Sequence, residues 1–228
     1  MKHAGKAQGA GFKLIFVTLV IILALLVIAF LAKTIGAFVL ALSSALLGGW
    51  LLFVVFTLYF FRDPEPRIPS GPGLVIAPGH GKVDFVGPHT EARFMGGPCQ
   101  RVSIFLSVFD VHVQNVPVAG RVILCQHTSG QYLNALRADS AEHNENVYIG
   151  IEAADPRGEK IGVRLIAGLI ARRIIPWVAA GEEVVRGDRM SLIQFGSRVD
   201  VYLPLHAKIK VKPGDRAVGG ETILAAFE

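Results

Sequence analysis

The chain has 228 residues, of which 52% are hydrophobic and 18% are charged, and its formal net charge at pH 7 is +5. This length allows one soluble domain of ordinary size and a further segment. Two cysteines, Cys99 and Cys125, are too few for a disulfide framework and agree with a reducing compartment. No basic run interleaved with aromatic residues is present, which argues against a nucleic-acid partner.

Two long apolar runs open the chain. The first, 14–32, has Thr18 as its only polar side chain, and the second, 35–61, has few polar interruptions. Each is long enough to cross a hydrocarbon core of about 30 Å as a helix. We therefore predict an N-terminal transmembrane helical hairpin over residues 1–61, turning at Lys33-Thr34. The alternatives are a cleaved signal peptide and a single span with a re-entrant partner.

Basic residues flank these apolar runs. Three lysines precede the first run and two arginines follow the second: Lys2, Lys6, Lys13, Arg62 and Arg67. The positive-inside tendency places both ends of the hairpin, and the domain that follows, on the cytoplasmic side of the cell membrane. Attraction to anionic lipid headgroups accounts for the modest positive charge.

The remainder reads as a linker and a domain rich in strands. Residues 62–73 are rich in proline and glycine, which predicts a stiff, extended linker. Residues 74–228 consist of short apolar or alternating runs separated by Gly, Pro and Asn, which is typical of strands. Strands are predicted at 74–77, 101–105, 118–124, 147–151 and 198–203. The run 161–175 is predicted to hold a strand leading into a short helix that Pro176 stops.

A weak internal repeat refines the fold class. Residues 180–188 and 212–224 both place a Gly-acid pair, a short gap with Val and a second glycine turn before an apolar strand. Such hairpins recur in barrel-sandwich hybrid domains. We therefore predict a mainly β, barrel-sandwich-hybrid-like domain with one or two short helices after the transmembrane hairpin. No lysine occupies a lipoyl-like tip, which argues against a carrier domain.

A Gly-Ser bond, Gly196-Ser197, lies near the C-terminus between two strand-like runs. Glycine leaves room for a hydroxyl to approach the preceding carbonyl, so this bond is a candidate for self-cleavage. The alternative is a Gly-Ser β-turn or bulge.

Four segments, taken in order, carry a resemblance to a known family. They are 60–64 (Phe-Phe-Arg-Asp-Pro), 75–83 (Val-Ile-Ala-Pro-Gly-His-Gly-Lys-Val), 104–113 (Ile-Phe-Leu-Ser-Val-Phe-Asp-Val-His-Val) and 195–197 (Phe-Gly-Ser). Together with Asn144-Glu145-Asn146 and 166–173, they make the chain resemble phosphatidylserine decarboxylase proenzymes of the short, bacterial and archaeal type.

The resemblance implies a pyruvoyl-dependent enzyme that processes itself. Ser197 would attack the Gly196 carbonyl, and β-elimination with hydrolysis would leave a β chain, 1–196, and an α chain, 197–228, headed by a pyruvoyl group. That group would form a Schiff base with the substrate amine and act as an electron sink, so neither pyridoxal phosphate nor a metal is expected. The implied reaction converts phosphatidylserine to phosphatidylethanolamine in phospholipid biosynthesis.

Histidine and aspartate side chains are the candidates for proton transfer. His112 matches a family histidine near the pyruvoyl group, and imidazole titrates near neutral pH, so we expect it to protonate the substrate. Asp110 would lie on the same face of a strand and orient the ring. The alternative is a strand histidine with one backbone hydrogen bond.

Two positions depart from the family pattern. His80 replaces the aspartate of an Ala-Asp-Gly motif that assists self-cleavage, and Asn115 stands where long-type enzymes have a second histidine. We expect His80 either to serve as the base for self-cleavage, oriented by Asp84 or Asp110, or to be a turn residue only. These departures keep open a maturation-deficient, membrane-anchored β-sandwich scaffold.

The remaining expectations concern the substrate and partners. Arg172 and Arg173 match a family motif, and a guanidinium suits a substrate phosphate, although a surface salt bridge or lipid contact explains them equally well. We expect a phospholipid substrate, α and β chains from one precursor, and leave a homo-oligomer open. A serine-headgroup lipid such as archaetidylserine would present the same head chemistry. A membrane-fusion adaptor is disfavoured because long coiled-coil heptads are missing.

Overall fold

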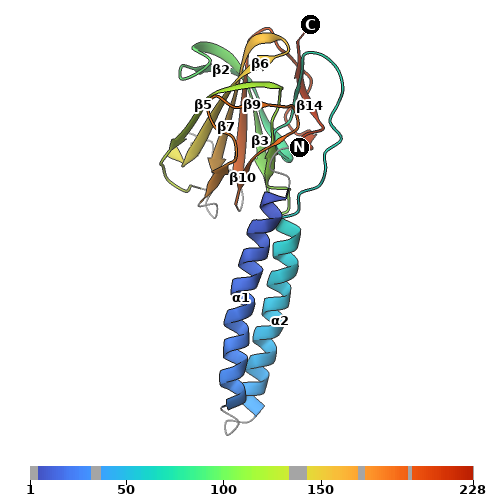
Figure 1. The fold of residues 1–228 in the computed structure, drawn as a ribbon. Helices are drawn as coiled ribbons and strands as arrows, with labels where there is room; N and C mark the ends of the chain where they lie inside the picture. Colours follow the sequence, from blue (N-terminus) through green and yellow to red (C-terminus); the bar gives the residue numbers. More distant parts are fainter. Residues whose placement is uncertain (1–4, 32–36, 134–142, 169–172, 195–196, 228) are drawn as a thin grey trace. The chain divides into compact units, whose positions relative to one another are not determined.

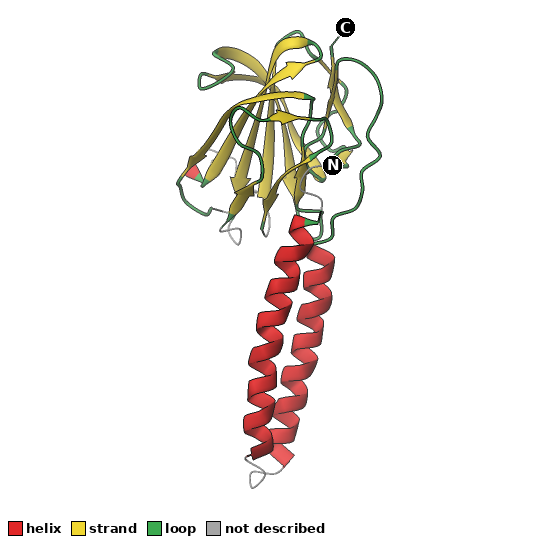
Figure 2. Ribbon diagram, viewed as in Figure 1, coloured by secondary structure: helices red, strands yellow, loops and turns green. Residues whose placement is uncertain are grey.

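The computed structural model describes residues 5–31, 37–133, 143–168, 173–194 and 197–227. Two helices come first, α1 (Lys6–Leu31) and α2 (Ala37–Phe60), and the strands β1 to β14 follow (Figure 1). The chain divides into a helical unit, 5–63, and a unit built from strands, 64–228 (Figure 2). The predicted fold class, a mainly β domain after two apolar helices, is confirmed.

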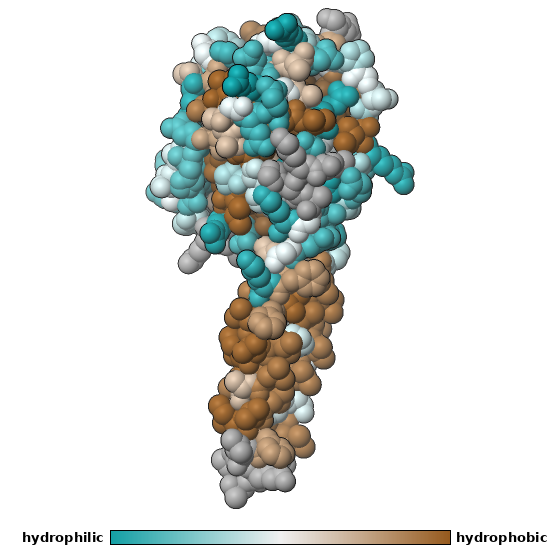
Figure 3. All heavy atoms as spheres, viewed as in Figure 1, coloured by the Kyte–Doolittle hydropathy of each residue, from teal (hydrophilic) through white to brown (hydrophobic). Residues whose placement is uncertain are grey.

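The helical unit is apolar on all sides. Its helices contain stretches of 25 and 22 residues, Lys6–Phe30 and Val39–Phe60, that are long and apolar enough to cross a membrane. Figure 3 shows their apolar surface, which contrasts with the mixed surface of the strand unit. A hydrogen bond from Trp50 Nε1 to Thr18 Oγ1, at 2.9 Å, joins the two helices. Helices that are apolar all round suit a lipid environment.

The helix bounds differ slightly from those predicted. α1 begins at Lys6 rather than at residue 14, because the lysines and alanines before the apolar run are themselves good helix formers. α2 runs from Ala37 to Phe60. The predicted turn at Lys33-Thr34 lies outside the described residues.

The linker is extended and lies against the strand unit. Residues 64–69 contain no helix or strand. Arg186 donates a hydrogen bond to Pro69 O at 3.0 Å, and the buried Arg189 donates one to a carboxylate oxygen of Glu65 at 3.1 Å. The linker is therefore fastened to the domain by side chains from β10 and the turn before it.

Three sheets make up the strand unit. The strands are β1 (Leu74–Ile76), β2 (Gly81–Glu91), β3 (Gly97–Leu106), β4 (Val113–Asn115), β5 (Gly120–Thr128), β6 (Asn146–Ala154), β7 (Arg157–Ala167), β8 (Ile174–Pro176), β9 (Glu183–Val184), β10 (Arg189–Ile193), β11 (Ser197–Leu203), β12 (Lys208–Ile209), β13 (Arg216–Ala217) and β14 (Ile223–Ala226). Eight form one sheet in the order β13-β2-β3-β11-β7-β6-β5-β9, and the others form β1-β14-β12 and β4-β10-β8. The helix predicted after β7 falls on 169–172, outside the described residues.

The core lies on the inner face of the eight-stranded sheet. β11 pairs antiparallel with β3 and with β7 over nearly its whole length, so it sits in the middle of the sheet. Its alternate residues Val199, Val201 and Leu203 are fully buried in the main apolar cluster. Because side chains alternate across a strand, Arg198, Asp200 and Tyr202 lie on the outer face.

The internal repeat is confirmed, and it is longer than the sequence indicated. β9 pairs with β5 as β13 pairs with β2. Four glycine amides donate equivalent bonds in the two halves: Gly214 to Val83 O at 2.8 Å and Gly181 to Val122 O at 2.7 Å, then Gly220 to Ala77 O and Gly187 to Val116 O, both at 2.8 Å. These bonds superpose 77–83 on 116–122, so His80 takes the place of Ala119.

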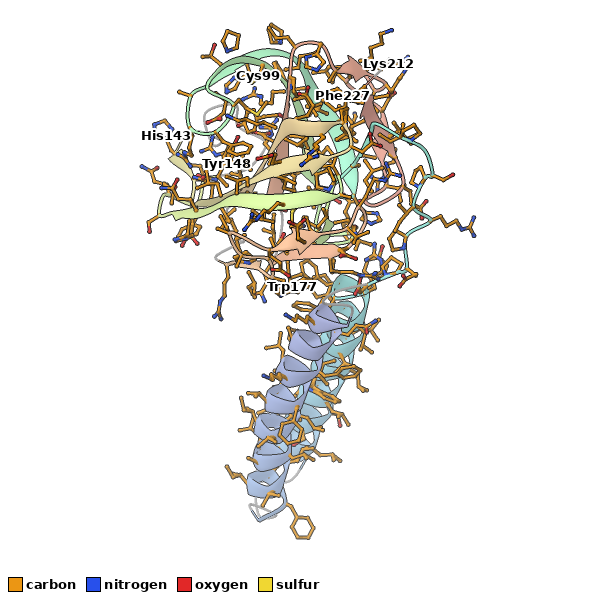
Figure 4. The ribbon with its side chains drawn as sticks, turned by 45° about the horizontal axis from the view of Figure 1, so that its top comes forward. Cys99, His143, Tyr148, Trp177, Lys212 and Phe227 are labelled. Carbon is orange, nitrogen blue, oxygen red and sulfur yellow. The ribbon has the colours of Figure 1, made fainter. Side chains whose placement is uncertain are left out.

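The outer face carries a small second cluster. Tyr148 and Tyr202 are fully buried and stacked, with ring centroids 5.7 Å apart, and Cys99 belongs to the same cluster. Figure 4 labels Tyr148 and Cys99 in the strand unit. Phe94, from the β2–β3 turn, covers this cluster at Gly150, where a Cβ atom would lie 2.7 Å from the Phe94 ring. The sheet is therefore packed on both faces.

Candidate active site

Ser197 is the first residue of β11, at the end of the inner face. Its neighbours across the sheet are Leu106 on β3 and Ala167 on β7. The side chain is fully buried, and Oγ has no hydrogen-bond partner within the part of the chain that the structure describes. A buried hydroxyl without a partner costs about 1–3 kcal/mol, so the fold holds Ser197 here at a penalty. Gly196 lies outside the described residues.

His112 lies beside the chain segment that leads to Ser197. It is fully buried, and its carbonyl oxygen accepts a hydrogen bond from Ile193 N, at the end of β10, at 3.2 Å. Its Nδ1 is 2.9 Å from Asp110 O. A carbonyl oxygen can only accept, so Nδ1 carries the proton and Nε2 is the atom that accepts a proton in the neutral ring.

Asp110 orients His112 differently from the prediction. Residues 107–110 form a turn closed by a hydrogen bond from Asp110 N to Ser107 O at 3.0 Å, so Asp110 and His112 do not share a strand face. The Asp110 carboxylate is 3% exposed, accepts from Ser107 N at 2.8 Å and pairs with Arg216. The histidine is held by the Asp110 main-chain carbonyl instead, because the turn directs the carboxylate away.

His80 lies in the loop between β1 and β2, and this loop packs at the Ser197 end of the sheet. A Cβ atom at Gly79 would lie 3.5 Å from Val199 Cγ2 and 3.6 Å from Leu106 Cδ1. The loop is tied to β4 by a hydrogen bond from Asn115 N to Pro78 O at 2.8 Å. The loop therefore brings His80 to the end of the sheet at which Ser197 and His112 also lie.

The repeat indicates whether the fold needs the His80 side chain. The equivalent turn in the other half has Ala119 and makes the same backbone hydrogen bonds, so an imidazole is not needed to form it. A Cβ atom at Gly219 would lie 2.9 Å from His80 Cδ2, so glycine there leaves room for the half-buried ring. Asp84 does not stand ready to orient His80, because its carboxylate pairs with Arg198.

Asn115 has a structural role. Its side chain is buried and donates from Nδ2 to Gly187 O at 2.9 Å, which joins β4 to the turn before β10. The position at which long-type enzymes have a second histidine is therefore used here to tie β4 to the turn before β10 within one half of the repeat.

The two arginines of the family motif are placed only in part. Arg172 lies outside the described residues. The Arg173 side chain is exposed, and its carbonyl oxygen accepts from Gln194 N at 3.2 Å. Arg173 therefore lies beside the chain just before the Gly196-Ser197 bond, and its side chain faces solvent.

Two residues of this region had no predicted role. Asn144 is buried and donates from Nδ2 to Ala167 O, the strand neighbour of Ser197, at 2.7 Å. Arg216 pairs with Asp110. The repeat could have indicated a role for Arg216. In one half Arg121 faces Glu183 across the strand pair, whereas in the other half Lys82 faces Arg216. Two like charges opposite each other are unfavourable, so an acidic side chain is expected nearby.

Comparison with known proteins identifies the family of the chain. The family model described as phosphatidylserine decarboxylase matches residues 53–225. The chain belongs to this family. It is 45% identical to a phosphatidylserine decarboxylase proenzyme of Symbiobacterium thermophilum over 181 residues, which cover 79% of this chain and 82% of that protein. It is 43% identical to a protein of the same name from Desulfotalea psychrophila over 175 residues, or 77% and 81% of the two chains.

Family membership makes the chain an enzyme of phospholipid metabolism, a decarboxylase. The word proenzyme in the names of both relatives indicates a precursor. Among the described residues, no group of three or more His, Cys, Asp and Glu side chains is arranged to hold a metal ion.

Proposed function

We propose that this chain cleaves its own Gly196-Ser197 bond and then decarboxylates phosphatidylserine to phosphatidylethanolamine. The observation that carries the proposal is the buried Ser197 Oγ, which has no hydrogen-bond partner among the described residues and lies at the end of the sheet that also brings in His112 and His80. A pyruvoyl group made from Ser197 fits this place, because β-elimination would remove the hydroxyl oxygen with Gly196, leave a methyl group at Cβ, and put a ketone at Cα where the nitrogen stood, at the start of a central strand.

The cleavage balances without an outside oxidant. Ser197 Oγ gives up its proton to a base, attacks the Gly196 carbonyl carbon and displaces the Ser197 nitrogen, which yields an ester. Loss of the Ser197 α-proton expels the Gly196 carboxylate, and water then replaces the remaining nitrogen, which leaves as ammonia. We assign the first base to His80, because the repeat shows that its turn does not need an imidazole.

His112 serves the decarboxylation itself. The pyruvoyl group supplies an electron sink next to the substrate amine, the role that pyridoxal phosphate fills in other decarboxylases. After carbon dioxide leaves, the substrate Cα needs a proton. His112 delivers it from Nε2, because the Asp110 carbonyl fixes the other ring proton on Nδ1 and so fixes the direction of the ring.

The rest of the chain positions these groups. Asn144 holds Ala167, which is the neighbour of Ser197 on β7. The apolar helices anchor the enzyme in the cell membrane where its lipid substrate lies, with the catalytic domain on the cytoplasmic side. Arg173, whose backbone lies beside the cleavage segment, and Arg172 stay proposed contacts for the lipid phosphate.

The test is intact mass spectrometry of the purified full-length chain beside a Ser197→Ala variant. We expect the wild type alone to give a fragment beginning at residue 197 with a ketoacyl terminus. The wild type should also release carbon dioxide from phosphatidylserine vesicles. A single uncut chain in both preparations, with no lipid product, would favour the scaffold instead. Faster turnover of archaetidylserine than of phosphatidylserine would reassign the substrate and keep the mechanism.

A further inference from the structure

A rigid turn separates the strand partner of Ser197 from His112. The turn, 107–110, is closed by three hydrogen bonds: Asp110 N to Ser107 O at 3.0 Å, Ser107 N to Asp110 Oδ2 at 2.8 Å, and Phe109 N to Ser107 Oγ at 3.3 Å. Leu106, just before it, pairs with Ser197. The turn is therefore fixed at the same end of the sheet as the site.

This turn presents an aromatic side chain to the outside. Phe109 is 65% exposed, although the residues that follow it, from Asp110 to His112, are buried. Exposed single apolar residues are common, but here the bonded turn holds one at the end of the sheet where Ser197 lies, and the proposed substrate is a lipid.

Basic groups flank the turn. Arg216 pairs with the turn residue Asp110, and its side chain is 68% exposed. Lys82 is exposed, lies opposite Arg216 in the strand register, and has no ion-pair partner among the described residues. An aromatic residue beside exposed basic side chains is a combination that binds an anionic lipid interface, where the ring enters the acyl boundary and the cations meet the headgroups.

We propose that the 107–110 turn inserts Phe109 into the interface of an anionic bilayer and so seats the mouth of the active site on the membrane. This inference rests on the proposed function, since it concerns how that site meets its lipid. Seating the mouth lets a serine headgroup reach Ser197 while its acyl chains stay in the bilayer. Arg216 and Lys82 then hold the headgroup layer against the rim.

The kinetic test compares Phe109→Ser with Leu205→Ser in the mature full-length chain. Leu205 is a matched control because it is 59% exposed and follows the opposite end of β11. With long-chain phosphatidylserine diluted in mixed micelles, we expect Phe109→Ser to raise the mole fraction needed for half-maximal rate about tenfold. Both variants should turn over monomeric dihexanoyl phosphatidylserine at the wild-type rate. Equal losses on both substrates, or in both variants, would overturn the proposal.

A second measurement tests membrane contact directly, so the proposal stays testable even if Phe109→Ser fails to fold. In uncleaved Ser197→Ala chains with Trp50→Phe and Trp177→Phe, a tryptophan is introduced by Phe109→Trp or by Leu205→Trp. We expect vesicles containing brominated phosphatidylserine to quench the fluorescence at position 109 at least threefold more than at 205. Equal quenching at positions 109 and 205 would overturn membrane insertion. So would an absence of quenching at position 109 together with a change of oligomeric state in the Phe109→Ser variant, since Phe109 would then contact another copy of the chain.

The two proposals fail in different ways. Quenching is measured on a chain that cannot mature, so it reports membrane contact even if no pyruvoyl fragment forms. Conversely, a mature chain that decarboxylates both lipids without any effect of Phe109 would keep the proposed function and reject the membrane-inserting turn.

Discussion

Single residues at the Ser197 end of the sheet carry the chemistry, and the repeat shows which of them the fold could do without. His80 occupies the turn position that Ala119 occupies in the other half, with the same backbone bonds on either side. Asp110 holds His112 through a main-chain carbonyl, a contact that any residue at 110 supplies if the turn stays closed. These two observations lead to opposite expectations for substitution.

Replacing His80 should block maturation and leave the fold intact. We expect His80→Ala to slow the appearance of the 197–228 fragment about 100-fold, which is the usual effect of removing a general base. Its free energy of unfolding should change by less than about 0.5 kcal/mol, since Ala119 shows that the turn accepts alanine. Mass spectrometry over time measures the first quantity and denaturant unfolding the second. His206→Ala, at an exposed histidine, is the control and should mature normally.

Replacing the Asp110 carboxylate should have a small effect. Asp110→Asn keeps an oxygen for Ser107 N and the carbonyl that holds His112, and it removes the ion pair with the exposed Arg216. Decarboxylation of short-chain substrate should therefore stay within about threefold of wild type, because the main-chain carbonyl that holds His112 is unchanged. A loss of 100-fold or more with normal maturation would instead show that the carboxylate itself orients His112.

At the scale of strands and turns, two glycines decide whether the halves of the repeat can form. A Cβ atom at Gly81 would lie 2.1 Å from Phe105 O, and one at Gly120 would lie 2.1 Å from Glu152 O. Both positions start long strands, and both are followed by a register shift, between Val83 and Phe85 or between Val122 and Leu124. The close backbone approach is therefore a property of the repeat.

Alanine at either glycine should destabilise the strand unit severely. We expect Gly81→Ala and Gly120→Ala each to lower the free energy of unfolding by more than about 3 kcal/mol, because backbone carbonyls cannot move aside as side chains do. Gly96→Ala is the control: it has a φ of +80° but open space, so its cost should be about 1–2 kcal/mol. Denaturant unfolding of uncleaved Ser197→Ala chains measures all three. Equal effects would mean that φ, rather than contact, limits these sites.

The outer face of the sheet gives a pH dependence. Burial, and after it the nearby Asp200 carboxylate, raises the pKa of Tyr202 to about 12, and burial likewise raises the pKa of Tyr148. An unfolded tyrosine ionises near pH 10. The contribution of Tyr202 is therefore complete below about pH 10 and is lost as the pH rises to about 12. Tyr202→Phe should flatten the fall in the free energy of unfolding over this interval, as measured by denaturant unfolding at a series of pH values.

The sequence predicted the elements of this fold better than their junctions. Alternating runs identified β11 and β6, and the glycine turns identified the second half of the repeat, because periodicity and positive φ leave marks on residue types. The sequence predicted a strand over 101–105 and placed Asp110 and His112 on one strand face, whereas residues 107–110 form a turn after β3. The bonds that Ser107 and Asp110 make to close this turn depend on backbone geometry, which residue types alone do not show.

The sequence identified the residues of the candidate site but not the contacts that those residues make. Ser197, His112 and His80 were selected by type and by family resemblance, and the structure places their segments at one end of the sheet. The partners of these residues were not predictable, because pairing between strands far apart in sequence brings Arg216 to Asp110 and Asn144 to Ala167. Such contacts follow from register, which a single sequence does not specify.

At the scale of the whole molecule, the proposed cleavage would cut the chain just before a central strand. β11 lies between β3 and β7, and its inner residues are part of the main apolar cluster. The α chain would also contain β12, β13 and β14, of which β13 pairs with β2 and β14 with β1. Four strands of the smaller fragment are thus paired within the sheets, and burial rather than a covalent bond would hold it.

Mature protein should therefore behave as a tight complex of two chains. Both cysteines are free, so no disulfide joins the fragments. We expect the α and β chains to elute together in mild detergent and to separate only in denaturant. Because unfolding then releases two molecules, the melting temperature of the mature protein should fall on dilution, whereas that of the uncut Ser197→Ala chain should stay constant. Scanning calorimetry over a hundredfold range of concentration measures this. A melting temperature independent of concentration in both proteins would mean that the fragments stay associated after the strand unit melts, and that the pairing of β11 with β3 and β7 is not what holds them together.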